Sequence, residues 1–147
     1  MEKYMEIALK EAGKALKKGD VPVGAAIVYK GKIIAKSYNK KQNKQIATLH
    51  AEIKVIEKAC KKLKTWHLED CELYVTMEPC VMCAGAIAQS RIKKVIFGVY
   101  NEKYGFTKFL KNEYQKTVFG NDFCYTEGIL KEEAEKMLKD FFKQKRK

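Results

Sequence analysis

The sequence predicts an α/β domain of three layers, in which helices cover both faces of a mixed five-stranded sheet. Stretches with apolar residues at helical spacing alternate with short extended runs along the whole chain. No internal repeat, low-complexity segment or linker interrupts this alternation. The length of 147 residues suffices for one domain with its own core. We therefore expect a single domain over residues 1–147.

The expected elements begin with a helix from Tyr4 to Leu16, which closes at Gly19-Asp20. Two extended runs follow, 23–29 and 32–38, and Lys30-Gly31 between them predicts a tight hairpin turn. The elements expected after these are a lysine-rich loop over 40–45, a helix over 50–63, a strand over 71–76, a helix over 80–90, a strand over 93–99, a short helix or ordered loop over 104–112, a short strand over 122–126 and an amphipathic helix over 129–142.

One histidine and two cysteines carry the clearest functional pattern. Cys80 and Cys83 have the spacing that lets two thiolates bind one metal ion, and His50 supplies a third zinc-type ligand. Three protein ligands leave one tetrahedral position open, which is typical of a catalytic rather than a structural zinc. Glu52 would then carry protons to and from a zinc-activated water. This pattern is the one described for zinc-dependent nucleobase deaminases.

Each of these residues also has a simpler explanation. The two cysteines could be small buried hydrophobes on a helix, and His50 could be a hydrogen-bonded core histidine. Glu52 could orient the imidazole instead of moving protons. The occurrence of all four residues together favours the zinc site. The other candidates have no partner at ligand spacing, and we expect a surface or interface position for His67 and packing roles for Cys60, Cys71 and Cys124.

Local geometry suggests how the four side chains could meet. Residues three apart share a helix face, so Cys80 and Cys83 both point at one metal if a helix begins near Pro79, a residue favoured in a first helical turn. The start of this helix would also stabilise both sulfurs as thiolates. His50 and Glu52 are two residues apart and must approach the site from different angles, which suits one ligand and one proton carrier.

Charge and targeting features narrow the possible partners. The formal net charge of +12 favours a polyanion such as nucleic acid. Only Arg91 and Arg146 are arginines, so the charge could instead reflect a lysine-rich composition of solvated side chains. The chain shows no secretory h-region and no apolar stretch of membrane-spanning length, and its five cysteines form no regular framework. We therefore expect a reducing, cytoplasmic location and no membrane partner.

Short motifs from the first helix to the last carry a family resemblance. They are VPVGA at 21–25, HAEI at 50–53, LYVT at 73–76, EPCVMCAGA at 78–86, SRI at 90–92, FG at 97–98, TEGIL at 126–130 and Phe141-Phe142 in a basic tail. Together they resemble the bacterial TadA-type tRNA adenosine deaminases. The zinc pattern is similar to that of the wider cytidine deaminase-like superfamily, whereas segments 78–91 and 126–130 resemble this branch in particular.

The resemblance implies a cytidine deaminase-like α/β/α fold, a homodimer, one zinc ion per subunit and no organic cofactor. It implies a hydrolase that converts adenosine to inosine at the wobble position, with a tRNA anticodon stem-loop as partner. It also implies that Asn39 contacts the nucleoside, that the Ala51 N–H helps hold the base, and that Lys103 and Phe142 lie along the RNA. Asn39 could instead stabilise a turn, and Phe141 and Phe142 could be core or interface residues.

Two segments depart from the family pattern. The usual Asp and small-residue loop is replaced by the bulkier segment 101–109, and the usual Asp-Pro-Thr-Ala by 46–49. A deaminase of a free base or nucleoside, such as guanine or cytosine, is therefore the alternative, and a non-catalytic zinc domain that binds RNA or a partner is a third.

An RNA substrate would be bound by basic and aromatic side chains near the pocket. We expect contacts from Lys103, Lys108 and the tail 139–147. The aromatic residues of the atypical loop would stack on flanking bases or close a hydrophobic patch, and they are Tyr104, Phe106 and Phe109.

Overall fold

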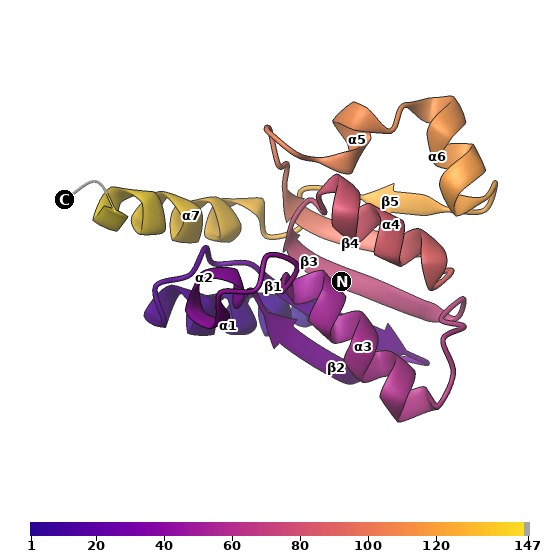
Figure 1. Ribbon diagram of the computed structural model, residues 1–147, viewed down its shortest axis with the longest axis horizontal. Coiled ribbons are helices and arrows are strands. Elements are labelled where there is room, and N and C mark those ends of the chain that lie inside the picture. The colour runs from indigo at the N-terminus through magenta and orange to yellow at the C-terminus, as the bar shows by residue number, and fades with distance from the viewer. Residues whose placement is uncertain (146–147) are drawn as a thin grey trace.

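Five strands form one mixed sheet in the order β2-β1-β3-β4-β5 in the computed structural model, which describes residues 1–145 (Figure 1). The strands are β1 (Gly24–Tyr29), β2 (Lys32–Tyr38), β3 (Cys71–Met77), β4 (Lys94–Val99) and β5 (Cys124–Thr126). β1 pairs antiparallel with both β2 and β3, whereas β3, β4 and β5 run parallel. The predicted five-stranded mixed sheet is confirmed.

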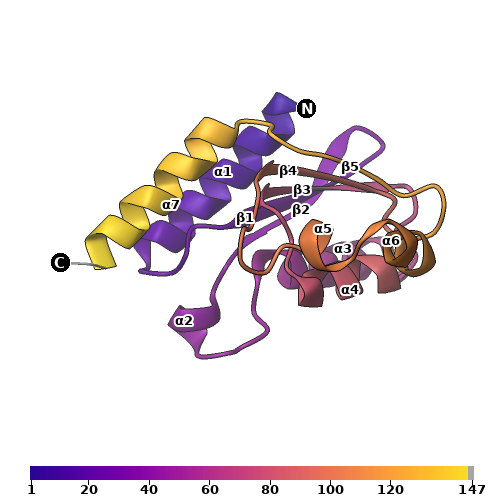
Figure 2. The same ribbon diagram turned by 90° about the horizontal axis from the view of Figure 1, so that it is seen from above.

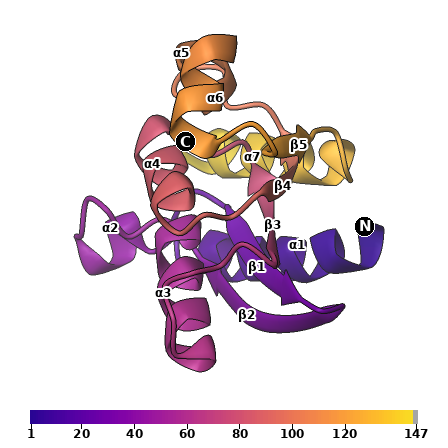
Figure 3. The same cartoon turned by 90° about the vertical axis from the view of Figure 1, so that its right-hand side faces the viewer.

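Helices cover both faces of this sheet. One face carries α1 (Glu2–Lys17) and α7 (Lys131–Lys145), and the other carries α3 (Ala51–Leu63) and α4 (Val81–Gln89) (Figure 2). The short helices α5 (Phe106–Phe109) and α6 (Asn112–Phe119) continue the second layer beyond α4 (Figure 3). The three-layer α/β/α fold is therefore also confirmed. No helix in residues 1–145 combines the length and the apolar character needed to cross a membrane.

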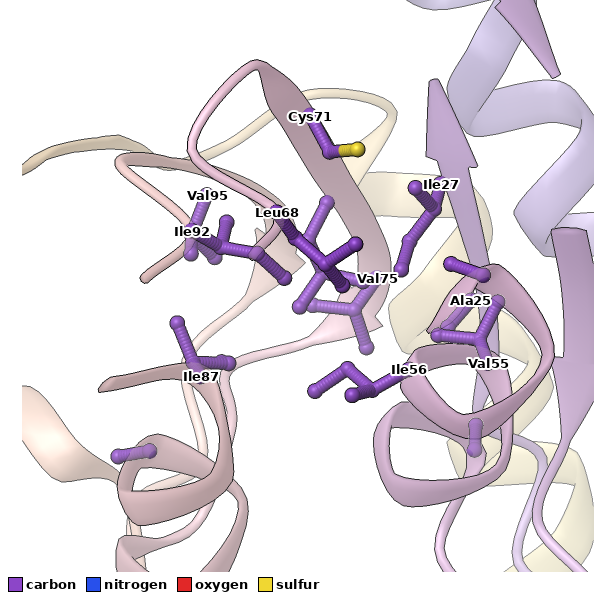
Figure 4. Close-up of a cluster of buried hydrophobic side chains, with 14 of the residues drawn as sticks. Ala25, Ile27, Val55, Ile56, Leu68, Cys71, Val75, Ile87, Ile92 and Val95 are labelled. Atoms are coloured by element: carbon purple, nitrogen blue, oxygen red, sulfur yellow. The ribbon is translucent and has the colours of Figure 1, made fainter. Parts of the chain in front are cut away.

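Alternating side chains of the central strands supply a core on each side of the sheet. On β3, Leu73 and Val75 point toward α3 and α4, whereas Tyr74 points toward α1 and α7. Figure 4 shows the first of these cores, in which Val55 and Ile56 of α3 and Ile87 of α4 face the strands. Because β1, β3 and β4 are covered on both faces, nearly all of their side chains are buried.

Most elements begin and end within three residues of the expected bounds, but two helices were not predicted. The expected loop 40–45 contains α2 (Lys41–Lys44), whose start is stabilised by a fully buried carboxylate. Asp20 accepts hydrogen bonds from the backbone N–H groups of Gln42 and Asn43 at 2.9 and 2.8 Å. Similarly, α6 is stabilised where Phe119 packs against Phe106. Both contacts are tertiary, and local sequence patterns do not contain them.

Candidate active site

The starts of two helices bring the three zinc-type ligands together. His50 directly precedes α3, Cys80 directly precedes α4, and both have extended backbone conformations. Cys83 lies in the first turn of α4. The Sγ atoms of Cys80 and Cys83 lie 3.7 and 3.6 Å from the Nδ1 atom of His50. The three ligand atoms all lie within 4.8 Å of one another, as the sequence pattern predicted.

This donor set fits a zinc ion. One imidazole nitrogen and two thiol sulfurs are ligands that zinc prefers, and they converge from two separate helix starts. Within residues 1–145, no second group of three His, Cys, Asp or Glu side chains converges in this way. The cluster could therefore hold a metal ion with three protein ligands.

Pro79 does not lie in the first turn of a helix, contrary to the expectation from the sequence. The helix begins at Val81, so Pro79 is two residues before it and Cys80 is the capping residue. The two cysteines still converge, because the backbone N–H of Ala84 donates to the carbonyl oxygen of Cys80 at 2.8 Å and closes the first turn. The capping geometry thus preserves the shared face that the spacing predicted.

The pKa values of the two thiols in the cluster are shifted in opposite directions. A hydrogen bond from the Cys83 thiol, together with one from the His50 ring, lowers the pKa of Cys80 to about 4. The same bond to Cys80 and burial raise the pKa of Cys83, and the bond to Cys80 raises the pKa of His50. Cys80 is therefore the more acidic of the two thiols, and the other two ligand residues stabilise its thiolate form.

Glu52 is a buried carboxyl group beside this cluster. It lies in the first turn of α3, with only 3% of its surface exposed. Burial raises the pKa of Glu52 to about 7, well above the usual range of a glutamate. A carboxyl group that titrates near neutral pH can both accept and donate a proton, as a proton carrier must.

A pocket of about 420 Å³ opens beside the cluster and contains the residues assigned to the substrate by resemblance. Glu52, His50 and Cys80 are among the residues that line it. All four predicted substrate residues line the same pocket, and they are Asn39, Ala51, Lys103 and Phe142. Segments distant in sequence, including α7, therefore converge on one cavity of the size used for small ligands.

Asn39 and Ala51 present polar groups of different availability. The side-chain amide of Asn39 donates to the carbonyl oxygen of Val21 at 3.1 Å and accepts from the backbone N–H of Lys41 at 3.1 Å. These bonds stabilise the turn, and the amide nitrogen can still donate its second hydrogen to a ligand. Ala51 is the first residue of α3, where a backbone N–H has no acceptor within its own helix. The backbone N–H of Ala51 is therefore available to donate a hydrogen bond to a base in the pocket.

The aromatic residues near the pocket divide into rim and core. Tyr104 and Phe142 are about half exposed and line the pocket, whereas Phe141 is buried. Phe106 is also buried and packs edge-on against the rings of a core cluster. Of its two expected roles, closing a hydrophobic patch therefore agrees with the structure and stacking on RNA bases does not. Phe109 is exposed on α5 away from the pocket lining. Of the expected basic tail, residues 146 and 147 lie outside the described residues.

The remaining cysteines and the second histidine lie outside the site. His67 is exposed and contacts Glu69 at 3.2 Å, as expected for a surface residue. Cys71 is buried and Cys60 is half-buried, in agreement with packing roles. Cys124 is exposed, so its expected packing role is wrong. It lies on β5 at the edge of the sheet, where an apolar run in the sequence does not imply burial on both faces.

Several pocket residues were not assigned a role from the sequence. Glu78 directly follows β3, Tyr100 and Asn101 directly follow β4, and all three residues line the cavity. Glu78 is buried, although it is an isolated acidic residue at the end of a strand. The position of Glu78 directly before Pro79-Cys80 could have indicated a role in the site. A charged side chain next to a ligand residue must either enter the site or find buried hydrogen-bond donors.

Comparison with known proteins agrees with this geometry. The model of the MafB19-like deaminase family matches residues 1–146. The tRNA-specific adenosine deaminase of Bacillus subtilis (strain 168) is 47% identical over 146 residues, which cover 99% of this chain and 91% of that protein.

Two solved structures extend the comparison to the fold. One comes from a study of A-to-I editing by tRNA:A34 deaminases at the wobble position of transfer RNA. It superposes with a TM-score of 0.84 and 35% identity over 94% of this chain and 100% of that chain. A guanine deaminase from Bacillus subtilis superposes with a TM-score of 0.64 and 40% identity, over only 67% of this chain and 64% of that one. The chain belongs to the family of tRNA-specific adenosine deaminases.

Proposed function

We propose that this protein is a zinc-dependent hydrolase that converts adenosine to inosine at the wobble position of tRNA. The observation that carries the proposal is the convergence of three zinc-type ligands and the buried Glu52 on one pocket. The family membership of the chain over nearly its whole length supports the choice of substrate.

The chemistry depends on one proton carrier. A zinc ion held by His50, Cys80 and Cys83 would lower the pKa of water to about 7 and so provide a nucleophile at neutral pH. With the ion bound, Glu52 would accept a proton from a water molecule that attacks C6 of the adenine, and it would pass this proton to N1 of the ring. Glu52 would then carry a second proton, taken from the hydroxyl group now on C6, to the amino group, which leaves as ammonia while the C6 oxygen becomes a carbonyl. The pKa of about 7 lets Glu52 perform both transfers.

The pocket walls suit a flat base that has left its stack. Val23 and Met77 contribute apolar surface, and the N–H of Ala51 and the amide of Asn39 contribute polar groups. An anticodon loop presents unstacked bases at little energetic cost, so its wobble base can enter without opening a duplex.

A second groove supports a polynucleotide rather than a free base. This groove of about 700 Å³ runs along α7 and shares Tyr100, Glu102 and Phe142 with the catalytic pocket. Its remaining lining includes three lysines, namely Lys131, Lys139 and Lys143, and one glutamate, Glu135, which pairs with Lys131. RNA that leaves the pocket can follow this groove, because lysines attract phosphates and the rim aromatics can stack on flanking bases.

The exposed face of α4 supports a homodimer. The helix contains no charged residue, yet Val81 and Met82 are 43% and 37% exposed. A helix that is apolar on all sides is normally buried, so a second copy of the chain would cover this face. Met82→Lys should then convert a dimer into a monomer, which light scattering would measure.

A cytoplasmic location completes the proposal, since five free cysteines suit a reducing compartment.

Sequencing of tRNA from cells with and without the protein tests the function. Loss of inosine at the first anticodon position on deletion is the expected result. In vitro, an anticodon stem-loop should be deaminated far faster than guanine, cytosine or free adenosine. Efficient turnover of a small heterocycle together with no activity on RNA would instead establish the alternative, a deaminase of a free base or nucleoside. The resemblance to a guanine deaminase makes guanine the first small substrate to test.

A further inference from the structure

Both carboxylate oxygens of Glu78 are used by one loop at the mouth of the pocket. Oε1 accepts a hydrogen bond from the backbone N–H of Asn101 at 3.0 Å. Oε2 accepts bonds from the backbone N–H and the hydroxyl of Thr107, at 2.8 and 2.6 Å. Glu78 is 3% exposed and forms no ion pair with the described residues. Its charge is therefore stabilised by donors from the two ends of a single loop.

The close approach of this loop requires a glycine. A side chain at Gly105 would overlap the Glu78 carboxylate and the carbonyl oxygen of Asn101. The backbone N–H of Phe106 also donates to the carbonyl oxygen of Pro79 at 3.0 Å, and Gly105 pairs with Cys80 in an isolated antiparallel bridge. The loop is thus attached to the same short segment, 78–80, that contributes a zinc-type ligand.

The loop held in this way presents two side chains to the pocket mouth. Lys103 and Tyr104 line the pocket, and the Lys103 Nζ atom lies 5.7 Å from the centre of the Tyr104 ring. A further bond, from the Tyr104 backbone N–H to the Asn101 side-chain oxygen at 3.0 Å, fixes the turn that carries them. A cation and an aromatic ring side by side suit a phosphate and a stacked base next to the reacting nucleotide.

From these contacts we infer that Glu78 is a positioning residue that holds Lys103 and Tyr104 against the RNA. It acts through the loop and not on the reacting atoms, because its two oxygens are occupied by loop donors. The inference rests on the proposed tRNA function and deepens it: Glu78 sets the affinity for the nucleotides that flank the target base.

The test compares the zinc-loaded full-length protein with four variants on an anticodon stem-loop. In Glu78→Gln, an amide NH₂ replaces one acceptor oxygen, so at least one loop N–H faces another donor. Thr107→Val removes only the hydroxyl donor, and Thr107→Ser retains it. Glu72→Gln is the matched control, since it neutralises a partly exposed glutamate on the same strand that pairs with Lys94 outside the pocket.

We expect Glu78→Gln to raise the KM for the stem-loop by about tenfold or more, while kcat stays within about threefold and zinc content is unchanged. Thr107→Val should shift KM in the same direction by less, and it provides the test if the Glu78 variant does not fold. Thr107→Ser and Glu72→Gln should keep the wild-type KM.

Three results would overturn the inference, and they are distinguishable. An unchanged KM in both Glu78→Gln and Thr107→Val, with wild-type turnover of the stem-loop intact, removes the role of Glu78 and leaves the proposed function standing. Loss of zinc or of kcat without a rise in KM places Glu78 in the metal site. A wild-type protein that is inert on RNA refutes the proposed function, and this inference with it.

Discussion

The Sγ atom of Cys83 lies 3.6 Å from the Nδ1 atom of His50, although 33 residues separate them in sequence. Each of the two side chains is positioned by its own helix start, and both helices pack on the same face of the sheet. The geometry of the cluster therefore depends on the fold of the whole α3–α4 layer. Because each helix is stabilised by its packing on the sheet, replacement of one ligand residue should alter the site while both helices stay folded.

Replacement of a cysteine ligand should remove the metal. In Cys80→Ser or Cys83→Ser, a hydroxyl takes the place of a soft thiolate, so zinc content should fall from about one ion per chain to near zero. Thermal stability should fall as well, because metal binding and folding are coupled. Elemental analysis measures the zinc. Cys124→Ser is the control, since this exposed cysteine lies on β5, and it should keep its zinc. Full zinc occupancy in both ligand variants would contradict the assignment.

Replacement of Glu52 should separate catalysis from metal binding. Glu52→Gln keeps the shape of the side chain but cannot accept and return a proton, so turnover should fall by about 10²–10⁴-fold while zinc content stays the same. Single-turnover kinetics with a stem-loop substrate measures the effect. Glu57→Gln on the same helix removes an exposed carboxylate and should leave turnover unchanged. A Glu52 variant with a third of the wild-type activity would refute its role as the proton carrier.

The basic residues around the pocket should determine RNA affinity. Simultaneous replacement of Lys103, Lys108, Lys143 and Lys145 by Gln should weaken binding to RNA of any sequence and flatten its dependence on salt, since fewer counterions are released. Titrations at several salt concentrations measure both quantities.

A matched set of four lysines controls for net charge. Lys30 and Lys32 flank the β1–β2 turn, at the end of β2 opposite to Asn39. Lys61 and Lys62 lie in the last turn of α3, at the end opposite to His50. Their replacement by Gln should change the salt dependence little. Equal effects of the two sets would show that the basic surface acts only through its overall charge.

Two aromatic residues of the atypical loop should respond in different ways to truncation. Phe106 is 1% exposed and contacts Phe119, Phe123 and Tyr125 edge-on, so Phe106→Ala should lower the free energy of unfolding by about 3–5 kcal/mol. Tyr104 is 58% exposed, so Tyr104→Ala should leave stability almost unchanged and raise the KM for the stem-loop. Denaturant unfolding and steady-state kinetics measure the two effects. Similar stability losses in the two variants would contradict this division.

The sequence by itself predicted the convergence of His50, Cys80 and Cys83, the placement of Glu52 in the same pocket and most of the secondary structure. Ligand chemistry depends on residue type, and a separation of three residues lets Cys80 and Cys83 converge where a helix begins between them. Apolar periodicity likewise predicts helices and strands from local information, which is why the order of elements and the mixed sheet were predictable.

Only the tertiary structure decided which side chains face the pocket and which face the core. Phe106 and Tyr104 are two residues apart and both aromatic, yet one is buried and the other lies on the rim. Asp20 accepts hydrogen bonds from the start of α2, and Glu78 accepts them from the 101–107 loop. In both cases the bonded segments are more than twenty residues apart in sequence. Buried carboxylates take their roles from donors that the folded chain brings to them, and no local pattern in the sequence encodes those donors.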